Sequence, residues 1–434
     1  MPEGRLLQGQ SSGGFQPLVM ACSGSGFQNC GVWRHCCRST GDIFPSNEVL
    51  RLRHRPEKRS PSCTLMRIVA HLDMDAFFAA IEERDHPSLR GLPIVIGADP
   101  RGGKGRGVVS TANYKAREYG IHSALPISKA WRLSEVARKQ GKSPATFLPV
   151  RMERYAEVSA HVMATLRRFV FLVEQASIDE AYFDLSSCES YTLAEEVCRK
   201  VKGAIRDEEQ LTASVGIGPN KLIAKIASGM CKPDGLTTVR EEDIAAFLAP
   251  LPVRTIPGVG PKTEAELASI GVKTVKNMRA FSQEELRGMF GKRGVDLYEK
   301  IRGRDESPIK ETYEAKSIGE QETFEQDTRD VPVLVERLRA ICQDVIGRLA
   351  AEGFTHFRTV VLTVRFADFE TKSRTHTLPS PTRDPRVLEE EARKLFVPFL
   401  DERENPHAKL IRLIGVRIEK LERFGVHAQA PLIE

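Results

Sequence analysis

Two short acidic clusters contain the residue types that chemistry on phosphates needs. Asp73 and Asp75 close an apolar, strand-like run, and Asp179 and Glu180 stand side by side in a turn between two apolar segments. Carboxylates at strand ends suit Mg²⁺, which takes oxygen ligands and lets substrate phosphates complete its octahedron. Two such ions about 3.5–4 Å apart can activate an attacking hydroxyl and stabilise a leaving pyrophosphate. Either cluster alone is more typical of a solubilising strand end, so the hypothesis depends on both.

Cations that suit a triphosphate lie on the predicted helix 113–118 and near a later turn. Tyr114 and Arg117 are three residues apart and therefore share one helix face. They lie close to the helix start, where free N–H groups attract anions. Lys225 and Lys232, around a Cys-Lys-Pro-Asp-Gly turn, add positive charge. Basic residues on one helix usually form a solvated face. These cations therefore indicate a triphosphate site only in combination with the acidic clusters.

A glycine-rich turn, residues 256–263 (IPGVGPKT), separates two predicted helices. Gly258 and Gly260 permit a tight turn and bring backbone N–H groups close to a ligand, while Thr263 is expected to cap the following helix. Such a hairpin can hold a nucleic-acid phosphate without reading bases. An ordinary helix–helix turn is the alternative.

The acidic clusters must be positioned by the elements around them, and from Met66 onward strands and helices alternate. This alternation predicts a mixed sheet covered by helices. The expected strands are 67–73, 93–97, 107–111, 172–175, 181–185 and 211–217, and the expected helices are 76–84, 113–118, 151–169, 192–207 and 219–230.

The pattern changes after this region. Residues 240–305 are predicted to be helical, and residues 306–315 are polar and typical of a tether. Two βαβ-like passes follow and predict a small open sheet with helices on one face. Their expected strands lie near 316–324, 359–366, 371–378 and 411–420, with helices at 331–351 and 384–403.

Cations alternate along one of these later strands. Lys372, Arg374 and His376 should share one face of the sheet, and Arg412 and Arg417 lie on the last strand. Phosphate contacts from such cations would make DNA affinity fall steeply with salt. A strand that simply faces solvent is the alternative.

The first 65 residues differ from the rest, being rich in Ser, Gly, Arg and Cys without an apolar period. They predict a disordered extension, or a segment that is not normally translated. A zinc site is the alternative, but no CxxC pair is present. The residues that could form it are Cys30, His35, Cys36, Cys37 and Cys63.

Composition excludes several classes of protein. The 434 residues suggest about two to four domains. No apolar run reaches the roughly 18 residues of a membrane-spanning helix, and the scattered later cysteines indicate a reduced, intracellular chain. The net charge is +6, but residues 1–65 hold eight Lys/Arg and only four Asp/Glu. The remainder is therefore nearly neutral, and net charge alone does not indicate a DNA partner.

The motifs together resemble the Y-family translesion DNA polymerases, in the DinB (DNA polymerase IV) branch. The resemblance runs in the family's order from Met66 to about Leu421. The matching segments are MRIVAHLDMDAFFAAIEERDHPSLRGLPIVIG, VVSTANYKAREYGIHSALPISKA, ASIDEAYFDLS, SVGIGPNKLIAKIASGMCKPDG, IPGVGPKT and IRLIGVRIEKL.

The resemblance implies an α+β multidomain, right-hand polymerase. It would have a mixed-sheet palm, small fingers, a helical thumb with a helix-hairpin-helix-like turn, and a βαββαβ-like little finger. The implied divisions are a 1–65 extension, a 66–239 palm with fingers inserted at about 76–150, a 240–305 thumb, a 306–315 tether, a 316–424 little finger and a 425–434 tail.

The resemblance also implies roles for the acidic residues. Asp73 and Asp179 match the aspartates that bridge two Mg²⁺ ions, the Met74 carbonyl matches the main-chain ligand, and Glu180 matches the catalytic glutamate. Asp75 is expected to support them.

Substrate-binding roles follow in the same way. Phe78 matches the steric-gate aromatic that excludes a ribose 2′-OH, whereas Phe77 is expected in the core. Tyr114, Arg117 and Lys232 match the residues that hold the incoming triphosphate. The expected DNA contacts are Gly258, Gly260, Lys262, Lys372, Arg374 and Arg412.

Three further residues are expected to be neither catalytic residues nor metal ligands. Glu82 is expected to support the site rather than to catalyse, and Asp184 is expected to lie behind the metal ligands. His71 is expected to be a packed strand residue rather than a ligand, because carboxylates suit Mg²⁺ better.

The implied function is template-directed addition of deoxynucleotides past damaged bases, with low fidelity and no proofreading. Primer–template DNA and deoxynucleoside triphosphates would be the partners, and we expect a cytoplasmic, nucleoid-associated bacterial monomer without a membrane partner. The alternatives are a DNA-binding scaffold with a dead site, which the intact carboxylate set disfavours, and a nucleotidyl cyclase, which would not need the thumb turn.

The C-terminal residues 429–433 (QAPLI) loosely resemble a bacterial sliding-clamp peptide, with a glutamine and paired apolar residues. Deleting residues 429–434 should therefore abolish clamp-stimulated synthesis and leave synthesis on a bare template intact. Primer extension with and without the clamp measures both rates. Unchanged stimulation in the truncated chain would dispose of the hypothesis.

Overall fold

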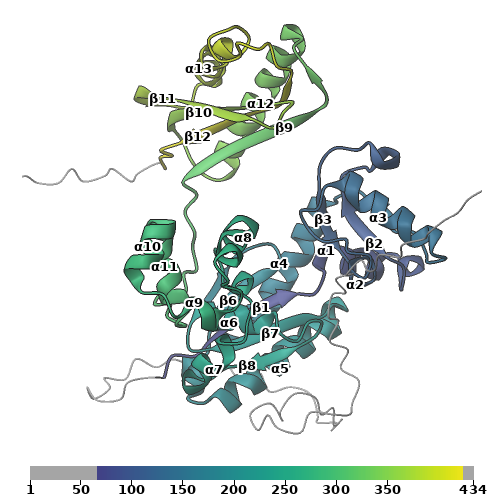
Figure 1. The fold of residues 1–434 in the computed structure, drawn as a ribbon, viewed down its shortest axis with the longest axis vertical. Helices are drawn as coiled ribbons and strands as arrows, with labels where there is room; N and C mark the ends of the chain where they lie inside the picture. Colours follow the sequence, from purple (N-terminus) through teal and green to yellow (C-terminus); the bar gives the residue numbers. More distant parts are fainter. Residues whose placement is uncertain (1–65, 424–434) are drawn as a thin grey trace, which may run out of the picture. The chain divides into compact units, whose positions relative to one another are not determined.

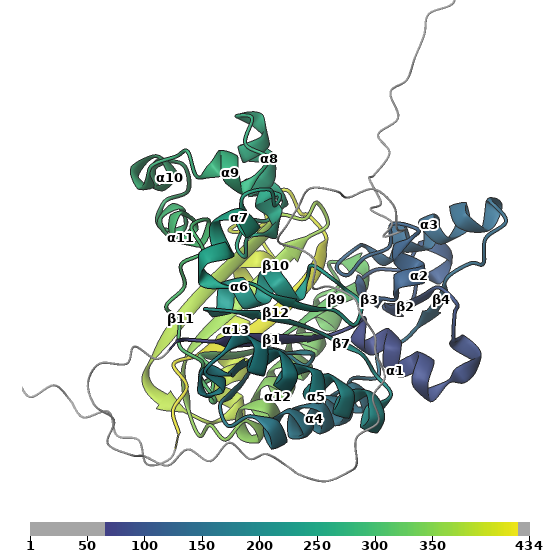
Figure 2. The same cartoon turned by 90° about the horizontal axis from the view of Figure 1, so that it is seen from below.

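A computed structural model describes residues 66–423, which Figures 1 and 2 show from two sides. The expected N-terminal extension, its alternative zinc site and the clamp-like tail lie outside the described residues. Three sheets of five, four and three strands organise the described part. No helix within residues 66–423 is long and apolar enough to cross a membrane.

The five-stranded sheet of the expected palm is mixed, as the alternation of elements predicted. Its strand order is β5-β6-β1-β7-β8. Strand β8 is missing from the sequence prediction because three residues are too few to show an alternation. The strands are β1 (Val69–Met74), β5 (Val173–Gln175), β6 (Glu180–Asp184), β7 (Ala213–Gly218) and β8 (Leu236–Thr238).

Strand β1 separates the main core from the candidate site. Ala70 and Leu72 of β1, with Ile68 just before it, point into a core that α4 (Met152–Phe169) and α5 (Tyr191–Glu209) complete. Because side chains alternate along a strand, the residues between them face the opposite side of the sheet. One face of the sheet is therefore sealed by apolar packing, and the other is available for polar chemistry.

Helix α6 (Lys221–Ser228) packs on this second face, across the sheet from α4 and α5 (Figure 2). Gly216 of β7 permits the close approach. A Cβ at Gly216 would lie 2.1 Å from the carbonyl oxygen of Ala224 and 2.3 Å from the amide nitrogen of Ser228. Both atoms belong to the helix backbone, so α6 could make room for a Cβ only by moving away from the sheet.

Helix α1 (Phe77–Asp85) leads from β1 into a small second sheet of order β3-β2-β4, the expected fingers. It starts directly after Ala76, whose left-handed backbone (φ 46°, ψ 43°) turns the chain sharply between strand and helix. The fingers have an apolar core of their own. Their elements are β2 (Ile94–Gly97), β3 (Val109–Ala112), β4 (Thr146–Leu148), α2 (Tyr114–Arg117) and α3 (Ile127–Lys139).

The region expected to be the thumb is helical and shares its core with one side of α6. Its helices are α7 (Ile244–Leu248), α8 (Pro261–Ser269), α9 (Val275–Met278), α10 (Gln283–Phe290) and α11 (Lys292–Lys300). The prediction that Thr263 caps a helix is wrong, because Thr263 lies inside α8 and Gly260 occupies the N-cap without a side-chain hydrogen bond. Thr274 and Ser282 form the capping boxes of this region.

The last sheet has the predicted βαββαβ order, with both helices on one face (Figure 1). Its strand order is β11-β10-β12-β9, and all its pairs are antiparallel. Helix α13 ends earlier than expected, at Phe396, because Pro398 lacks an N–H and restricts the residue before it. The elements are β9 (Ser317–Thr328), α12 (Val331–Ala351), β10 (Phe357–Phe366), β11 (Thr371–Thr382), α13 (Pro385–Phe396) and β12 (Ile411–Glu419).

Gly216 provides a test of the close contact between sheet and helix. Gly216→Ala should lower the free energy of unfolding by about 3 kcal/mol, because the added methyl group overlaps helix backbone. The control Gly203→Ala lies within α5, where a Cβ meets nothing within 4 Å, and should raise it by about 0.5–1 kcal/mol. Urea unfolding followed by circular dichroism measures both. Equal effects of the two substitutions would contradict the contact.

Candidate active site

The register of β1 and β6 brings the two acidic clusters together. Asp73 lies directly opposite Glu180 in this antiparallel pair. The amide of Met74 donates a hydrogen bond to the carbonyl oxygen of Asp179 at 3.0 Å. The sequence clusters, more than a hundred residues apart in the chain, therefore meet at one end of β1.

Asp73 lies in a site that is crowded with negative charge. Lys232 forms an ion pair with its Oδ1. Burial nevertheless raises the pKa of Asp73 to about 6, and the nearby Glu180 and Asp179 add to the rise while Lys232 opposes it. One ammonium group is therefore not enough to compensate this carboxylate for its lost hydration. The site favours additional positive charge.

Glu180 has the opposite character. The Lys225 ammonium donates to both of its oxygens, at 2.7 and 2.8 Å. His71 and Lys225 together hold the pKa of Glu180 at about 2, so it is ionised at neutral pH. The sequence suggests Lys225 as a further cation for the triphosphate, but in the structure it forms an ion pair with Glu180.

His71 is fully buried in β1, and its Nδ1 lies 2.8 Å from Ser228 Oγ. Burial lowers its pKa, so the ring is neutral at pH 7. Its Nε2 lies 3.9 Å from Glu180 Oε2 and has no hydrogen-bond partner among the described residues. This packing agrees with a strand residue whose second nitrogen is directed at the acidic site.

The turn before β6 is held by Ser177. Its hydroxyl accepts hydrogen bonds from the amides of Asp179 and Glu180, at 3.2 and 3.1 Å, and donates to Asp179 Oδ1 at 2.6 Å. A serine side chain that bonds its own turn fixes the local backbone. The carboxylate of Asp179 is thus held at the tip instead of extending into solvent.

Asp75 connects three parts of the site. Its buried carboxylate accepts from Thr212 Oγ1 (2.9 Å), Ser214 Oγ (2.8 Å) and the Asp234 amide (2.7 Å). The Tyr114 hydroxyl lies 3.4 Å from it. Asp75 therefore positions both the turn that carries Lys232 and the helix that carries Tyr114. Sequence reasoning missed Thr212 and Ser214, although their spacing of two in a mainly apolar strand was a signal.

Tyr114 and Arg117 lie together on α2. The Arg117 guanidinium lies 4.7 Å from the centre of the Tyr114 ring, and its Nε donates to the Ala112 carbonyl oxygen at 2.9 Å. Burial and the nearby Asp75 raise the Tyr114 pKa, so the phenol stays protonated and can donate a hydrogen bond. Asn113 caps the helix by accepting from the amide of Ala116.

The neighbouring phenylalanines differ in their surroundings. Phe77 is 2% exposed and belongs to the core. Phe78 is only partly buried, and its ring stacks on that of Tyr155, with centroids 4.2 Å apart and planes 14° apart. Phe78 therefore keeps part of its side chain accessible, and its ring is held in place by the ring of Tyr155.

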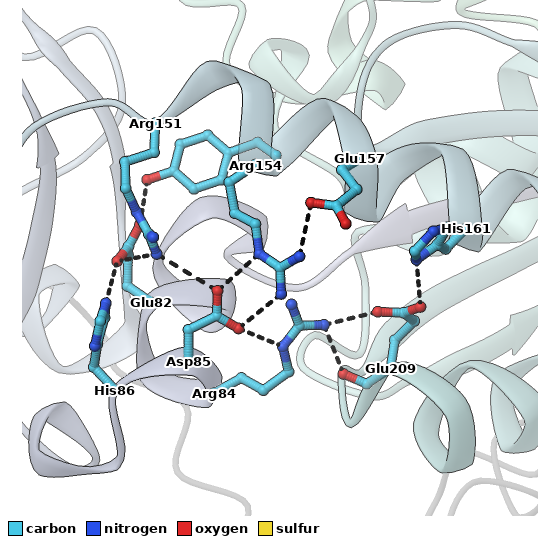
Figure 3. Close-up of polar contacts among 10 residues, drawn as sticks. Glu82, Arg84, Asp85, His86, Arg151, Arg154, Glu157, His161 and Glu209 are labelled. Atoms are coloured by element: carbon cyan, nitrogen blue, oxygen red, sulfur yellow. Dashed lines mark hydrogen bonds and ion pairs between the residues drawn. The ribbon is translucent and has the colours of Figure 1, made fainter.

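An ion-pair network joins α1 to α4 (Figure 3). Arg151 donates to both oxygens of Glu82, each at 2.8 Å. Arg154 and Arg84 donate to Asp85. The network is centred on two carboxylates of α1, Glu82 and Asp85, and Arg151 links them because its guanidinium also lies 3.5 Å from Asp85 Oδ2.

Asp184 does not lie beside the metal-type ligands. It pairs with Val69, four positions along β1 from Asp73, and accepts from the amide and hydroxyl of Ser186. At about 3.3 Å per residue this places it roughly 13 Å away along the strand. Asp184 stabilises the turn after β6, and its expected place behind the site is wrong.

The glycine turn lies beside a pocket of about 280 Å³ lined by Gly258, Arg293, Asp296 and Leu297. Gly258 has a φ of +104°, which only glycine adopts easily, and Lys300 donates to the adjacent Pro257 carbonyl oxygen at 3.2 Å. Lys262 is exposed in the first turn of α8, two residues after the N-cap Gly260.

The cations of β11 face the helices of their sheet. In register, Lys372, Arg374 and His376 pair with the core residues Val364, Leu362 and Val360. Lys372 and Arg374 form ion pairs with Glu404, and His376 Nδ1 lies 2.6 Å from Glu391 Oε2. A phosphate would have to displace those carboxylates, so a DNA contact by Lys372 and Arg374 stays a prediction.

Arg412 and Arg417 differ from that group. Arg412 lies over the Phe369 ring at 4.5 Å, with Asp327 at 3.7 Å. Arg417 pairs with Val361 in register and lies on the face that the helices leave open, where Glu419 is its ion-pair partner at 2.7 Å.

The donor set fits a divalent cation that is completed by a substrate. Across residues 66–423, no three His, Cys, Asp or Glu side chains are grouped so that they could hold a metal ion. Two lysine ammonium groups instead occupy positions against Asp73 and Glu180, and a buried nitrogen of His71 lacks a partner. Mg²⁺ commonly takes one or two carboxylates plus phosphate oxygens, which matches this arrangement.

Comparison with known families covers most of the chain. Residues 72–229 match the impB/mucB/samB family, and residues 315–431 match the C-terminal domain of that family. Residues 254–305 match a thumb domain described for DNA polymerase-iota.

Individual relatives and solved structures agree with these matches. The chain is 44% identical to DNA polymerase IV of Methanoculleus marisnigri, over 85% of this chain and 98% of that protein. It is 43% identical to DNA polymerase IV 2 of Methanosarcina mazei, over 84% and 95%. A Y-family DNA polymerase chimera of Dbh and Dpo4 superposes with a TM-score of 0.70 at 28% identity, over 82% of this chain and 99% of the chimera. The insertion ternary complex of Dbh DNA polymerase has a TM-score of 0.57, with the same identity and coverage.

Asp85 makes the helix network sensitive to pH. Hydrogen bonds from Arg154 and Arg84 lower its pKa to about 2, so its ion pairs stabilise the fold above the ordinary pKa near 4. That stability is lost as the pH falls from about 4 towards 2. Asp85→Asn should therefore lower the free energy of unfolding at pH 7 by about 1 kcal/mol, since solvent screens part of the interaction.

Urea unfolding at pH 7, 5 and 3 measures this difference, which should shrink at pH 3. The control Glu157→Gln removes an exposed ion pair to the same Arg154 and should change stability little. A deficit of equal size at pH 7 and pH 3 would contradict the assignment.

Proposed function

This chain belongs to the impB/mucB/samB family, and on that premise we propose how its residues carry out DNA synthesis. It is a DNA-directed DNA polymerase of the translesion type, with primer–template DNA and deoxynucleoside triphosphates as partners. The observation that carries the mechanism is the cross-strand pair of Asp73 and Glu180, together with its two lysine counter-ions.

The family uses divalent metal ions, and we infer two Mg²⁺ ions here. Asp73 and Asp179, with the main-chain carbonyl of Met74, would hold them, and Glu180 would act beside them as the catalytic glutamate. Support comes from the meeting of both acidic clusters at the end of β1 and from the raised pKa of Asp73. When bound, the ions supply Lewis acidity at the primer hydroxyl and at the phosphates.

The pKa of Glu180 assigns it an electrostatic role. A carboxylate with a pKa of about 2 is a poor proton acceptor near neutral pH. Glu180 therefore acts as a fixed negative charge that holds cations close to Asp73. Lys225 stays with Glu180 and keeps it oriented.

The triphosphate is held by three cationic or phenolic groups. Lys232 exchanges Asp73 for a phosphate oxygen when substrate is bound, and Tyr114 and Arg117 donate from α2. Asp75 supports both sides, because it bonds the turn after Lys232 and lies within 3.4 Å of the Tyr114 hydroxyl. Preorganised donors of this kind stabilise charge that develops as pyrophosphate leaves.

Phe78 is the steric gate in this proposal. Its partly exposed ring follows β1 by four residues and is fixed against Tyr155. A rigid apolar ring next to the sugar leaves no room and no hydrogen-bond partner for a 2′-OH.

DNA contacts are proposed for the thumb turn and the last sheet. Gly258, Gly260 and Lys262 would bind a phosphate beside the pocket at that turn. On the last sheet, Lys372, Arg374 and Arg412 would each exchange a carboxylate partner for a phosphate. The monomeric state, clamp binding and the cytoplasmic site of action stay predictions.

Primer extension tests the metal assignment. Asp179→Ala should lower the rate at least about a hundredfold, because one of the cation-holding charges is lost. The control Asp207→Ala removes an exposed carboxylate from α5 and should extend normally. EDTA should stop the wild-type reaction, and Mg²⁺ should restore it. Retained extension by Asp179→Ala would contradict the assignment.

A further inference from the structure

Tyr155 of α4 spans two positions of α1 that are one helical turn apart. Phe78 and Glu82 have i, i+4 spacing and therefore share one face of α1. The ring of Tyr155 stacks on Phe78, and its hydroxyl donates to Glu82 Oε1 at 2.7 Å. One side chain thus contacts the proposed gate with its face and a buried carboxylate with its tip.

Glu82 is almost fully buried, with 4% of its side chain exposed, and its charge is compensated by a small set of donors. Arg151 binds both oxygens and Tyr155 binds one of them. Burying a carboxylate costs free energy unless such donors are held in place. Because buried Glu82 requires these hydrogen-bond donors, the Tyr155 hydroxyl is held in one place. The ring of Tyr155, against which Phe78 stacks, is held with it.

Both donors come from the first turn of α4. Arg151 is its N-cap residue, and the Tyr155 amide donates to the Arg151 carbonyl oxygen at 3.1 Å. The guanidinium of Arg151, which binds both oxygens, fixes the orientation of the Glu82 carboxylate (Figure 3). That orientation fixes where the Tyr155 hydroxyl can bind.

We propose that Glu82, oriented by Arg151 and acting through Tyr155, is a positioning residue that sets the sugar selectivity of the polymerase. The inference rests on the proposed role of Phe78 as the gate. Glu82 does not touch the substrate. Glu82 holds the Tyr155 ring behind Phe78, so that Phe78 cannot move aside when a ribonucleotide enters.

The other half of the network distinguishes this role from simple helix clamping. Asp85 also joins α1 to α4, through Arg154 at 2.9 Å and through a longer ion pair to Arg151 at 3.5 Å, and is also largely buried. None of its hydrogen bonds goes to Tyr155 or Phe78. A purely structural clamp predicts similar consequences for Glu82 and Asp85, whereas positioning of the gate predicts a change in sugar selectivity for Glu82 alone.

The experiment measures kcat and KM for a deoxynucleotide and its ribonucleotide on an undamaged primer–template with the full chain. Glu82→Gln and Tyr155→Phe should each lower the deoxy-over-ribo ratio of kcat/KM about tenfold, the loss expected for one charge-assisted hydrogen bond. The change should come from better use of the ribonucleotide, with the deoxynucleotide KM little changed. Asp85→Asn should leave the ratio at the wild-type value.

Double variants test the route of the effect. Glu82→Gln with Tyr155→Phe should be little worse than Tyr155→Phe alone, because Glu82→Gln weakens the same hydrogen bond that Tyr155→Phe removes. In a Phe78→Ala background, where the ratio is already low, Glu82→Gln should add nothing. An additional loss there would overturn the proposal, since Glu82 would then act on the sugar by another route.

The outcomes separate this inference from the proposed function. If Phe78→Ala lowers the ratio but Tyr155→Phe and Glu82→Gln do not, the positioning role is wrong and the gate stands. If Phe78→Ala leaves the ratio unchanged, the gate assignment itself is wrong. Tyr155→Phe keeps the test decisive if Glu82→Gln fails to fold, because it removes only a hydroxyl.

Discussion

The antiparallel register between β1 and β6 forces two carboxylates, Asp73 and Glu180, to lie opposite each other at a partly buried strand end. Like charges at such a distance repel, and burial removes much of the water that would screen them. Two lysine side chains of the surrounding structure supply compensating positive charge. Lys225 of α6 neutralises Glu180, and Lys232 pairs with Asp73 without fully compensating it. A cluster that still lacks cations is a suitable place to recruit divalent ions together with a triphosphate.

Packing of α6 on the sheet is what makes this compensation possible. Gly216 lets the helix approach so closely that Lys225 reaches both oxygens of Glu180 and Ser228 reaches His71. On its other side, α6 shares a core with the thumb helices. A small residue in a buried strand therefore contributes to the electrostatics of the site although it carries no functional group.

Much of the arrangement could be predicted from the sequence, because local patterns determine it. The alternation of strands and helices from Met66 onward indicated the mixed sheet, and the βαββαβ order followed from strand and helix periods. What could not be predicted depends on register or on tertiary partners. The orientation of Lys372 and Arg374 toward the helices requires knowing the partners of β11 in β10. The remote position of Asp184 likewise follows only from its pairing with Val69. No sequence pattern indicates that Tyr155 lies behind Phe78, since these residues come from separate helices.

The acidic site and the proposed steric gate are connected by a few consecutive residues. Asp73 ends the strand, Ala76 turns the chain in a left-handed conformation, and Phe78 lies in the first turn of α1. An alanine in that conformation costs about 1 kcal/mol, which persists only because the surroundings fix both ends. Asp75 binds one end to β7, and Glu82 binds the other to α4. Because the two anchors hold the same short segment, the distance between the acidic site and the gate is determined by structure on both sides and not by the turn alone. In the proposed mechanism, loosening either anchor should therefore shift the sugar relative to the reacting phosphate.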